Sequence, residues 1–187
     1  MSTNNINQNL TNLASPKIGT KIIEVSDDFF GEASRMLDDK EAVFIEDKYD
    51  EHGKWMDGWE SKRRRDGGND WAIIELGSPG IISEVDIDTS FFTGNFPPFA
   101  SIEGLYSDQK PNKDSDWIEI ISKKTLKGDS SNKFKIQSKT KVNYIKLQIF
   151  PDGGVARLRL FGEVKFDWDV YNNKKDLIEL SSLKLGG

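Results

Sequence analysis

Short apolar runs separated by polar turns dominate the chain between residues 21 and 161. Runs of four to eight residues bounded by Gly, Pro, Asp, Ser and Lys are typical of β-strands. The clearest is residues 155–161, VARLRLF, in which Ala156, Leu158 and Leu160 share one face. The predicted strands are Lys21–Val25, Ala42–Ile45, Trp71–Leu76, Ile81–Asp88, Ala100–Tyr106, Asp116–Ser122, Phe134–Gln137, Val142–Phe150 and Val155–Phe161.

The segments between these strands contain the expected turns and one long loop. GSPG at residues 77–80 predicts a turn that joins two strands. Ser26–Met36 predicts a short helical turn, with Ser26 and the acids that follow it at the amino end. Residues 48–70 show no period of 2 or 3.6, and a loop of this length in a compact domain is often functional. Eight or nine strands with almost no helix predict an all-β antiparallel sandwich.

Composition narrows the class of protein. The chain has 187 residues, enough for one domain, and its hydrophobic content of 36% allows a real core. A net charge of −5 gives no global attraction for nucleic acid or an anionic membrane, so neither is expected as a partner. The sequence contains no Cys, no apolar run of membrane-spanning length and no secretory signal, which predicts a cytoplasmic protein.

A second stretch of the chain resembles the first. Residues 9–20, NLTNLASPKIGT, and residues 176–187, DLIELSSLKLGG, share two Leu, a Ser, a Lys and a Gly when they are aligned without gaps. Self-similarity at the spacing of one domain indicates a repeat, although short Leu- and Ser-containing stretches also match by chance. We therefore expect a disordered tail at 1–15, the sandwich at 16–165, and a linker with the truncated start of a second repeat at 166–187.

Several long motifs resemble the allantoicase family. They are KWMDGWESKRRR at 54–65, DIDTSFFTGNFPP at 86–98, ASIEG at 100–104 and PDGGVARLRLFGEV at 151–164, with SDDFFGEASRML at 26–37 similar as well. The resemblance implies a jelly-roll sandwich of the galactose-binding-like type. It also implies hydrolysis of allantoate to ureidoglycolate and urea. The family carries two such sandwiches in tandem, and this sequence matches the first, so activity of one repeat is open.

The implied substrate defines what a site must supply. Allantoate bears a carboxylate and two ureido groups on one carbon, so releasing urea calls for a general acid at nitrogen and a base for water. Arginine suits the substrate carboxylate because its guanidinium is a planar fork of donors. We expect Arg63, Arg64 and Arg65 to bind substrate, with Arg63 and Arg65 on one face. The alternative is that at least one of them pairs with a nearby Asp and only holds the loop.

Three carboxylates are the candidate catalytic groups. Asp57 lies between Trp55 and Trp59, and Glu60 directly follows Trp59; indole rings beside a carboxyl raise its pKa. The alternative role for both is to accept backbone N–H groups within the loop. Glu103 lies in a predicted strand and is either an inward-facing acid or an exposed residue of the sheet.

The FFTGN turn supplies the candidates for ureido recognition. Asp88, Thr93, Gly94 and Asn95 are predicted to bind substrate, because Gly94 lets a ligand approach the backbone and the polar groups can bond ureido atoms. Local turn bonding by these side chains is the alternative. The two Phe residues of the turn, at 91 and 92, are expected to pack rather than to line a pocket.

The sequence offers few residues for histidine chemistry or cofactor binding. His52 is the only histidine, so a multi-His metal site is excluded, and we expect His52 to be an exposed loop residue. No cofactor is expected, while an all-carboxylate Mg²⁺ or Mn²⁺ site stays open. We expect a homo-oligomer or pairing with a separate second repeat. A non-catalytic remnant and a carbohydrate-binding module are the alternative functions.

Overall fold

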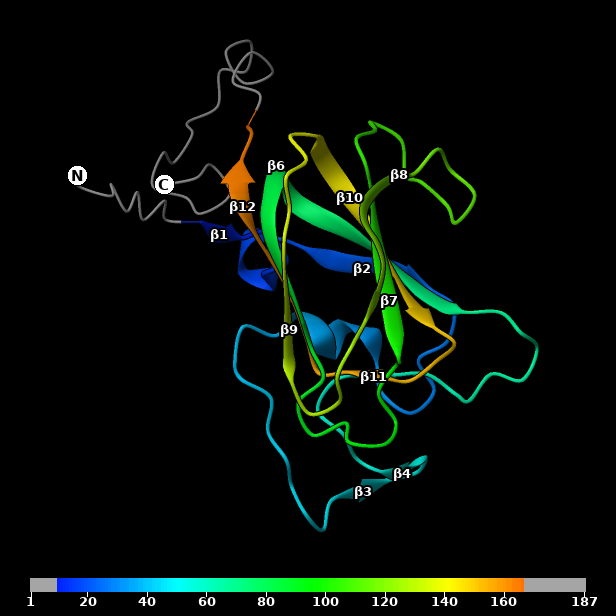
Figure 1. Ribbon diagram of the computed structural model, residues 1–187. Helices are drawn as coiled ribbons and strands as arrows, with labels where there is room; N and C mark the ends of the chain where they lie inside the picture. Colours follow the sequence, from blue (N-terminus) through cyan, green and yellow to red (C-terminus); the bar gives the residue numbers. More distant parts are fainter. Residues whose placement is uncertain (1–9, 167–187) are drawn as a thin grey trace, which may run out of the picture.

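The computed structural model describes residues 10–166, and these residues form strands and two short 3₁₀ helices (Figure 1). The elements are β1 (Thr11–Asn12), η1 (Pro16–Ile18), β2 (Lys21–Val25), η2 (Ala33–Leu37), β3 (Tyr49–Asp50), β4 (Gly53–Lys54), β5 (Trp59–Glu60), β6 (Asp70–Asp88), β7 (Phe99–Leu105), β8 (Ile118–Thr125), β9 (Ser131–Lys135), β10 (Lys141–Phe150), β11 (Gly154–Val155) and β12 (Arg157–Val164).

The strand β6 joins the two layers of the molecule. Its first half pairs with β2 and β10, and β10 continues through β7 to β8. Its second half pairs with β12 and β9, and β12 pairs with β1. Every one of these pairings is antiparallel, so the predicted antiparallel all-β sandwich is confirmed. β5 pairs separately with β11, and β3 pairs with β4.

The predicted turn at residues 77–80 is wrong, because β6 runs through it for 19 residues. The two glycines of this segment instead allow another part of the chain to pack closely against β6. A Cβ on Gly77 would lie 1.9 Å from the carbonyl oxygen of Ile18, and one on Gly80 would lie 2.6 Å from Leu13. The segment around η1 therefore crosses β6 where only glycine leaves room.

The core lies between the two layers. Ile74, Ile145 and Leu147 of one layer and Leu158 and Leu160 of the other are fully buried in a single apolar cluster. Alternate residues of these strands face inward, which is the pattern that predicted them. Removing this apolar surface from water is the main driving force for the fold.

Three other expectations from the sequence need correction. Ala42–Ile45 is not a strand, and Phe44 is 44% exposed. The disorder expected for residues 1–15 is wrong for residues 11–15, because β1 pairs with β12 and Leu13 is fully buried. The helical turn is η2, and Ser26 does not cap it because its hydroxyl donates to Asp70 instead.

Other parts of the expected domain layout lie outside the described residues, namely positions 1–9 and 167–187, and the latter include the segment 176–187 that resembles the opening of the chain. Across residues 10–166, no helix has the length and apolar character that a membrane crossing requires.

Candidate functional site

Residues of β5 and of the loops beside it line two adjoining hollows. These loops lie at the end of the sandwich where β11 is labelled in Figure 1. The first, here called the aromatic hollow, has a volume of about 540 Å³. The second, the arginine hollow, has a volume of about 450 Å³. Phe30, Glu60 and Asn95 line both, so these residues form the boundary between them. The aromatic hollow is otherwise lined by Phe44, His52, Lys54, Met56, Phe91, Thr93 and Asp129.

The backbone around β5 holds Glu60 in this position. β5 pairs with β11, and the N–H and carbonyl of Glu60 are both bonded to Gly31 on its other side. The preceding Trp59 is fully buried, and its indole N–H donates to the Asp27 carbonyl at 2.8 Å. Because neighbouring side chains of a strand point to opposite faces, burying Trp59 turns Glu60 towards the hollows.

The carboxyl of Glu60 has an unusual environment. Partial burial raises its pKa, and a hydrogen bond that its Oε1 accepts from Nδ2 of Asn95 at 2.7 Å partly opposes this effect. A carboxyl group with a raised pKa keeps its proton to higher pH and can act as a general acid.

Asn95 is held by close packing between its loop and the loop before β11. Its carbonyl accepts the N–H of Gly154 at 2.7 Å. Gly153 has φ = 137°, and a Cβ there would lie 2.7 Å from the same carbonyl oxygen. Phe92 is fully buried against Gly154, as expected for a packing residue. The same expectation for Phe91 is wrong, because Phe91 lines the aromatic hollow and stacks on Phe44 with ring centroids 5.8 Å apart. The polar turn is therefore fixed before any ligand binds.

The three consecutive arginines occupy different environments. The guanidinium of Arg64 donates to Asp66 at 2.7 Å and to the fully buried Asp70 at 2.6 Å, and it holds the pKa of Asp66 well below its usual range. Arg64 thus holds the loop, which was the alternative role considered from the sequence. Arg63 and Arg65 are exposed and share a third hollow with Arg64, but of those two only Arg63 also lines the arginine hollow.

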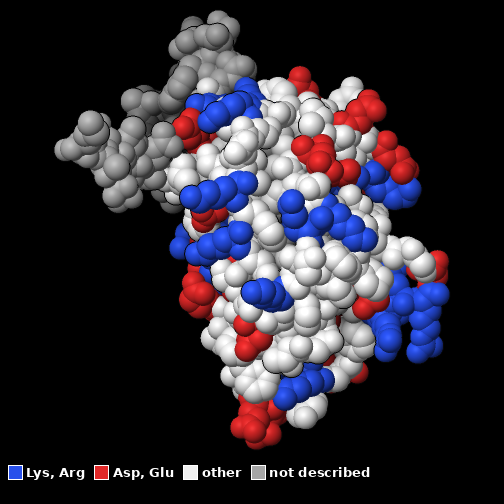
Figure 2. Space-filling view, in the orientation of Figure 1, with Lys and Arg blue, Asp and Glu red and all other residues white. Residues whose placement is uncertain are grey.

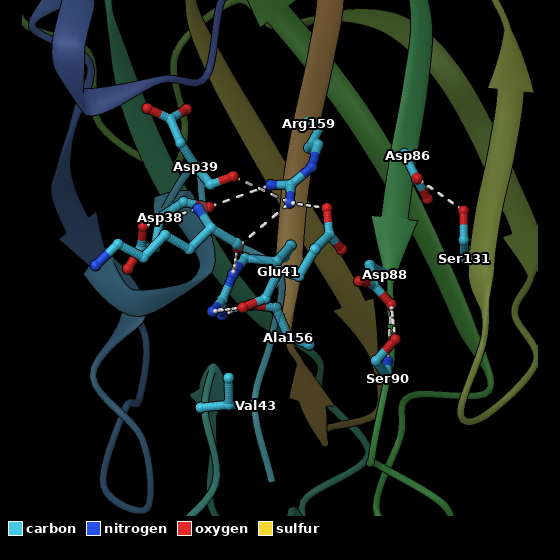
Figure 3. Close-up of polar contacts among 12 residues, drawn as sticks. Asp38, Asp39, Glu41, Val43, Asp86, Asp88, Ser90, Ser131, Ala156 and Arg159 are labelled. Atoms are coloured by element: carbon cyan, nitrogen blue, oxygen red, sulfur yellow. Dashed lines mark hydrogen bonds and ion pairs between the residues drawn. The ribbon is translucent and has the colours of Figure 1, made fainter.

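Three of the sequence-predicted carboxylates have structural partners and line neither hollow. Asp57 accepts a hydrogen bond from Arg157 at 2.7 Å and another from the N–H of Val43 at 2.9 Å. Asp88 accepts the N–H and hydroxyl of Ser90, and this local bonding is drawn in Figure 3. Glu103 forms an ion pair with Lys146 of β10 at 2.6 Å. The geometry gives no support to the catalytic or binding roles expected for these three.

The structure brings together Glu60, Arg63, Arg64, Thr93, Gly94 and Asn95 from the predicted set. It adds residues that sequence reasoning did not select, most notably His52, Lys54 and Asp129. His52 is only partly exposed and lines the aromatic hollow, so its expected role as an exposed loop residue is wrong. Within the described part of the chain, no group of three or more His, Cys, Asp and Glu side chains could hold a metal ion.

Comparison with known proteins identifies relatives of the chain. Residues 11–165 match the model of the allantoicase repeat. A probable allantoicase of Burkholderia mallei is 46% identical over 177 residues, which is 94% of this chain and 52% of the relative. A probable allantoicase of Acinetobacter baylyi is 47% identical over 173 residues, which is 92% of this chain and 52% of the relative. The chain therefore spans about half the length of these curated relatives.

Solved structures agree with this result. The crystal structure of allantoicase from Saccharomyces cerevisiae superposes with a TM-score of 0.75 and is 32% identical, covering 84% of this chain and 49% of the yeast chain. A family 32 carbohydrate-binding module of Clostridium perfringens, solved with galactose, gives a TM-score of 0.54 at 15% identity over 81% of this chain and 98% of that one. At that identity the second match shows a shared fold alone.

Proposed function

This chain belongs to the allantoicase family, and from that premise we propose that it supplies the catalytic cleft of an enzyme that hydrolyses allantoate to ureidoglycolate and urea. The proposed site is the pair of hollows on either side of Glu60 and Asn95. Allantoate and ureidoglycolate are its proposed ligands, and the proposed compartment is the cytoplasm.

The residues of the arginine hollow match the polar groups of allantoate. Arg63 is exposed, lines this hollow and forms no ion pair within residues 10–166, so its guanidinium is available to a substrate carboxylate. The side-chain carbonyl of Asn95 can bond ureido groups, as can the hydroxyl of Thr93 from the adjoining aromatic hollow. A Cβ on Gly94 would meet no atom within 4 Å, so a ligand can approach the backbone there.

The proposal depends most on the carboxyl of Glu60. The leaving nitrogen of urea needs a proton, and the raised pKa of Glu60 keeps a proton available at the boundary of the two hollows. Asp57 is poorly suited to this task because its carboxylate already binds Arg157 and the N–H of Val43 and lines neither hollow.

Measurement of urea release from allantoate tests the proposal. The Glu60→Gln variant keeps the size and the hydrogen-bonding capacity of the side chain but cannot donate a proton as a carboxylic acid, so we expect a fall in kcat of about 10²–10⁴-fold. Glu119→Gln, at an exposed position of β8, is the matched control and should leave kcat unchanged. A Glu60→Gln variant with full activity would refute the assignment.

We also propose that the site works within an assembly, either a homo-oligomer or a pair with a separate second repeat, because the chain spans about half of its curated relatives. If the chain releases urea only after a second-repeat polypeptide is added, the site is shared between repeats. If neither form releases urea, the chain is a non-catalytic remnant of the family.

A further inference from the structure

The β3–β4 hairpin carries the only histidine of the chain to the aromatic hollow. Tyr49 pairs with Lys54 and Asp50 with Gly53, which leaves Glu51 and His52 at the turn. The carboxylate of Asp50 accepts the N–H of His52 at 2.9 Å, and Gly53 has φ = 129°, a conformation that favours glycine. The turn is therefore built from local interactions that fix the backbone of His52.

Aromatic contacts then attach the hairpin to the rim of the site. The ring centroids of His52 and Phe29 are 4.1 Å apart, and Phe29 packs edge-on against Phe30, which lines both hollows. The ammonium of Lys54 lies 4.5 Å from the ring centroid of Phe44, another wall residue. These two contacts place His52 among the residues that surround the aromatic hollow with Glu60.

The charged groups around His52 begin with Asp50 and Glu51, which directly precede it in the hairpin. Lys54 of the same hairpin, Glu60 of β5 and Asp129 of the loop before β9 line the same hollow. Lys62 lies over the Phe29 ring at 3.9 Å. Asp129 already accepts the N–H of Phe91 at 2.8 Å, and a lysine ammonium offers donors but no acceptor. An imidazole is the side chain whose neutral form accepts a proton most readily near neutral pH.

We propose that His52 is the general base that activates water opposite the acid Glu60. This inference rests on the proposed hydrolysis of allantoate. His52 takes a proton from water as the water oxygen bonds to the carbon that bears the carboxylate. The bond from that carbon to one ureido nitrogen breaks, its electron pair stays on nitrogen, and Glu60 gives that nitrogen a proton. The products are ureidoglycolate and urea, and a proton returns from His52 to Glu60 through solvent.

Because the chain has one histidine, NMR reports on this group without ambiguity. The full chain would be titrated with N-carbamoylglycine, a stable acid that carries one ureido group and one carboxylate. We expect saturable changes in the imidazole signals of His52 together with the side-chain amide of Asn95. Changes at Asn95 without any at His52 would overturn the role of His52 and leave the proposed function standing. No change at either position would overturn both.

Kinetics with variants separate a catalytic role from a structural one. In the form that releases urea, His52→Ala should lower kcat by about 10²–10⁴-fold. It should also abolish the fall in kcat/KM at acidic pH, where protonation of the imidazole blocks a base. Added free imidazole should restore part of the lost rate to His52→Ala but should have no effect on Glu60→Gln. A His52→Ala variant with the wild-type pH profile and no imidazole response would refute the proposal.

Discussion

Asn95 and Glu60 form a pair in which the amide acts on the charge of the acid. The Nδ2–H of Asn95 donates to the carboxyl of Glu60 at 2.7 Å and lowers its pKa, while burial raises it. Removing the amide should leave burial unopposed, so Asn95→Ala should raise the pKa of Glu60 further. Since the acid is active when protonated, we expect the alkaline fall of kcat/KM to move to higher pH. The pH–rate profile of Thr93→Ala, which lines the same hollow, is the control.

The triple arginine offers a matched comparison of neighbouring residues. Arg63 and Arg65 are both exposed, but only Arg63 lines the arginine hollow. Losing a hydrogen bond to a charged group costs about 1.5–3 kcal/mol, so Arg63→Ala should raise KM by roughly 10–150-fold. Arg65→Ala should change KM little, and neither should shift the free energy of unfolding by more than about 0.5 kcal/mol. Equal effects on KM would show that the hollow does not select between them.

Residue types alone predicted part of this site. Glu60 was selected because it directly follows a tryptophan, and Asn95 because it lies in a glycine-containing turn, and both line the hollows. Spacing grouped Arg63 with Arg65, but it could not show that only Arg63 of the two lines the arginine hollow. It also could not show that Arg64 bonds Asp70, because the path of the loop back to Asp70 decides that contact. His52 was missed because a hairpin turn and a contact with Phe29, which no local pattern signals, bring it to the hollow.

At the scale of elements, two arginines of β12 hold the segment that precedes the site. Arg157 is 1% exposed and donates to Asp57 and to the carbonyls of Arg35, Lys40, Glu41 and Ala156. Arg159 donates to the carbonyls of Asp38, Asp39 and Lys40 and pairs with Glu41 (Figure 3). The carbonyl groups of residues 38–41 therefore accept hydrogen bonds from guanidinium groups and not from a neighbouring strand. This explains why the apolar run that follows, at residues 42–45, is not a strand.

These two arginines should differ in their effect on stability. A lysine at 157 has one ammonium in place of a fork, so it cannot serve several carbonyls and Asp57 at once. Breaking a buried ion pair costs about 3–5 kcal/mol, and we expect Arg157→Lys to lower the free energy of unfolding by that amount. Arg159→Lys should cost about 1 kcal/mol or less because its partner Glu41 is exposed. Urea unfolding measures both, and equal losses would contradict this view of Arg157.

The sequence pattern predicted strands correctly where buried and exposed residues alternate. It failed where contacts with distant parts of the chain determine whether a segment joins the sheet. The pattern found β10 and β12 because one face of each is buried. It divided β6 at GSPG because glycine and proline usually mark turns, whereas here the glycines admit the segment around η1. Apolar residues at 42–45 were read as buried, but the arginines of β12 hold the preceding backbone on the outside of the sandwich.

At the scale of the whole molecule, the resemblance between residues 9–20 and 176–187 has a structural reason in the described copy. Leu13 is fully buried, Ser15 caps η1 by accepting the N–H of Lys17, and Gly19 ends η1 with φ = 94°. Leu180, Ser182 and Gly186 repeat these three residue types in the same order and spacing. The positions that match are those that open the sandwich, so the sequence predicts the start of a second one, and that segment lies outside the described residues.

The distribution of charged and apolar side chains on the surface indicates where the molecule can self-associate. Cationic and anionic side chains are interspersed over the face drawn in Figure 2, so no large field of one sign dominates it. The segment 43–45 instead presents Val43 at 52%, Phe44 at 44% and Ile45 at 45% exposure, beside the aromatic hollow that Phe44 lines. Exposed apolar groups that gather in one place are typical of interfaces, because covering them removes apolar surface from water.

We therefore expect the chain to self-associate through this segment, with a second copy as the partner. A cation within an apolar interface must be desolvated without a partner, so Val43→Lys combined with Ile45→Lys should shift the chain towards monomer at micromolar concentration. Ile118→Lys is the control, since Ile118 is 50% exposed on β8. Light scattering measures the mass of each variant. A monomeric wild type would refute self-association, and an equal shift with Ile118→Lys would place the contact elsewhere on the surface.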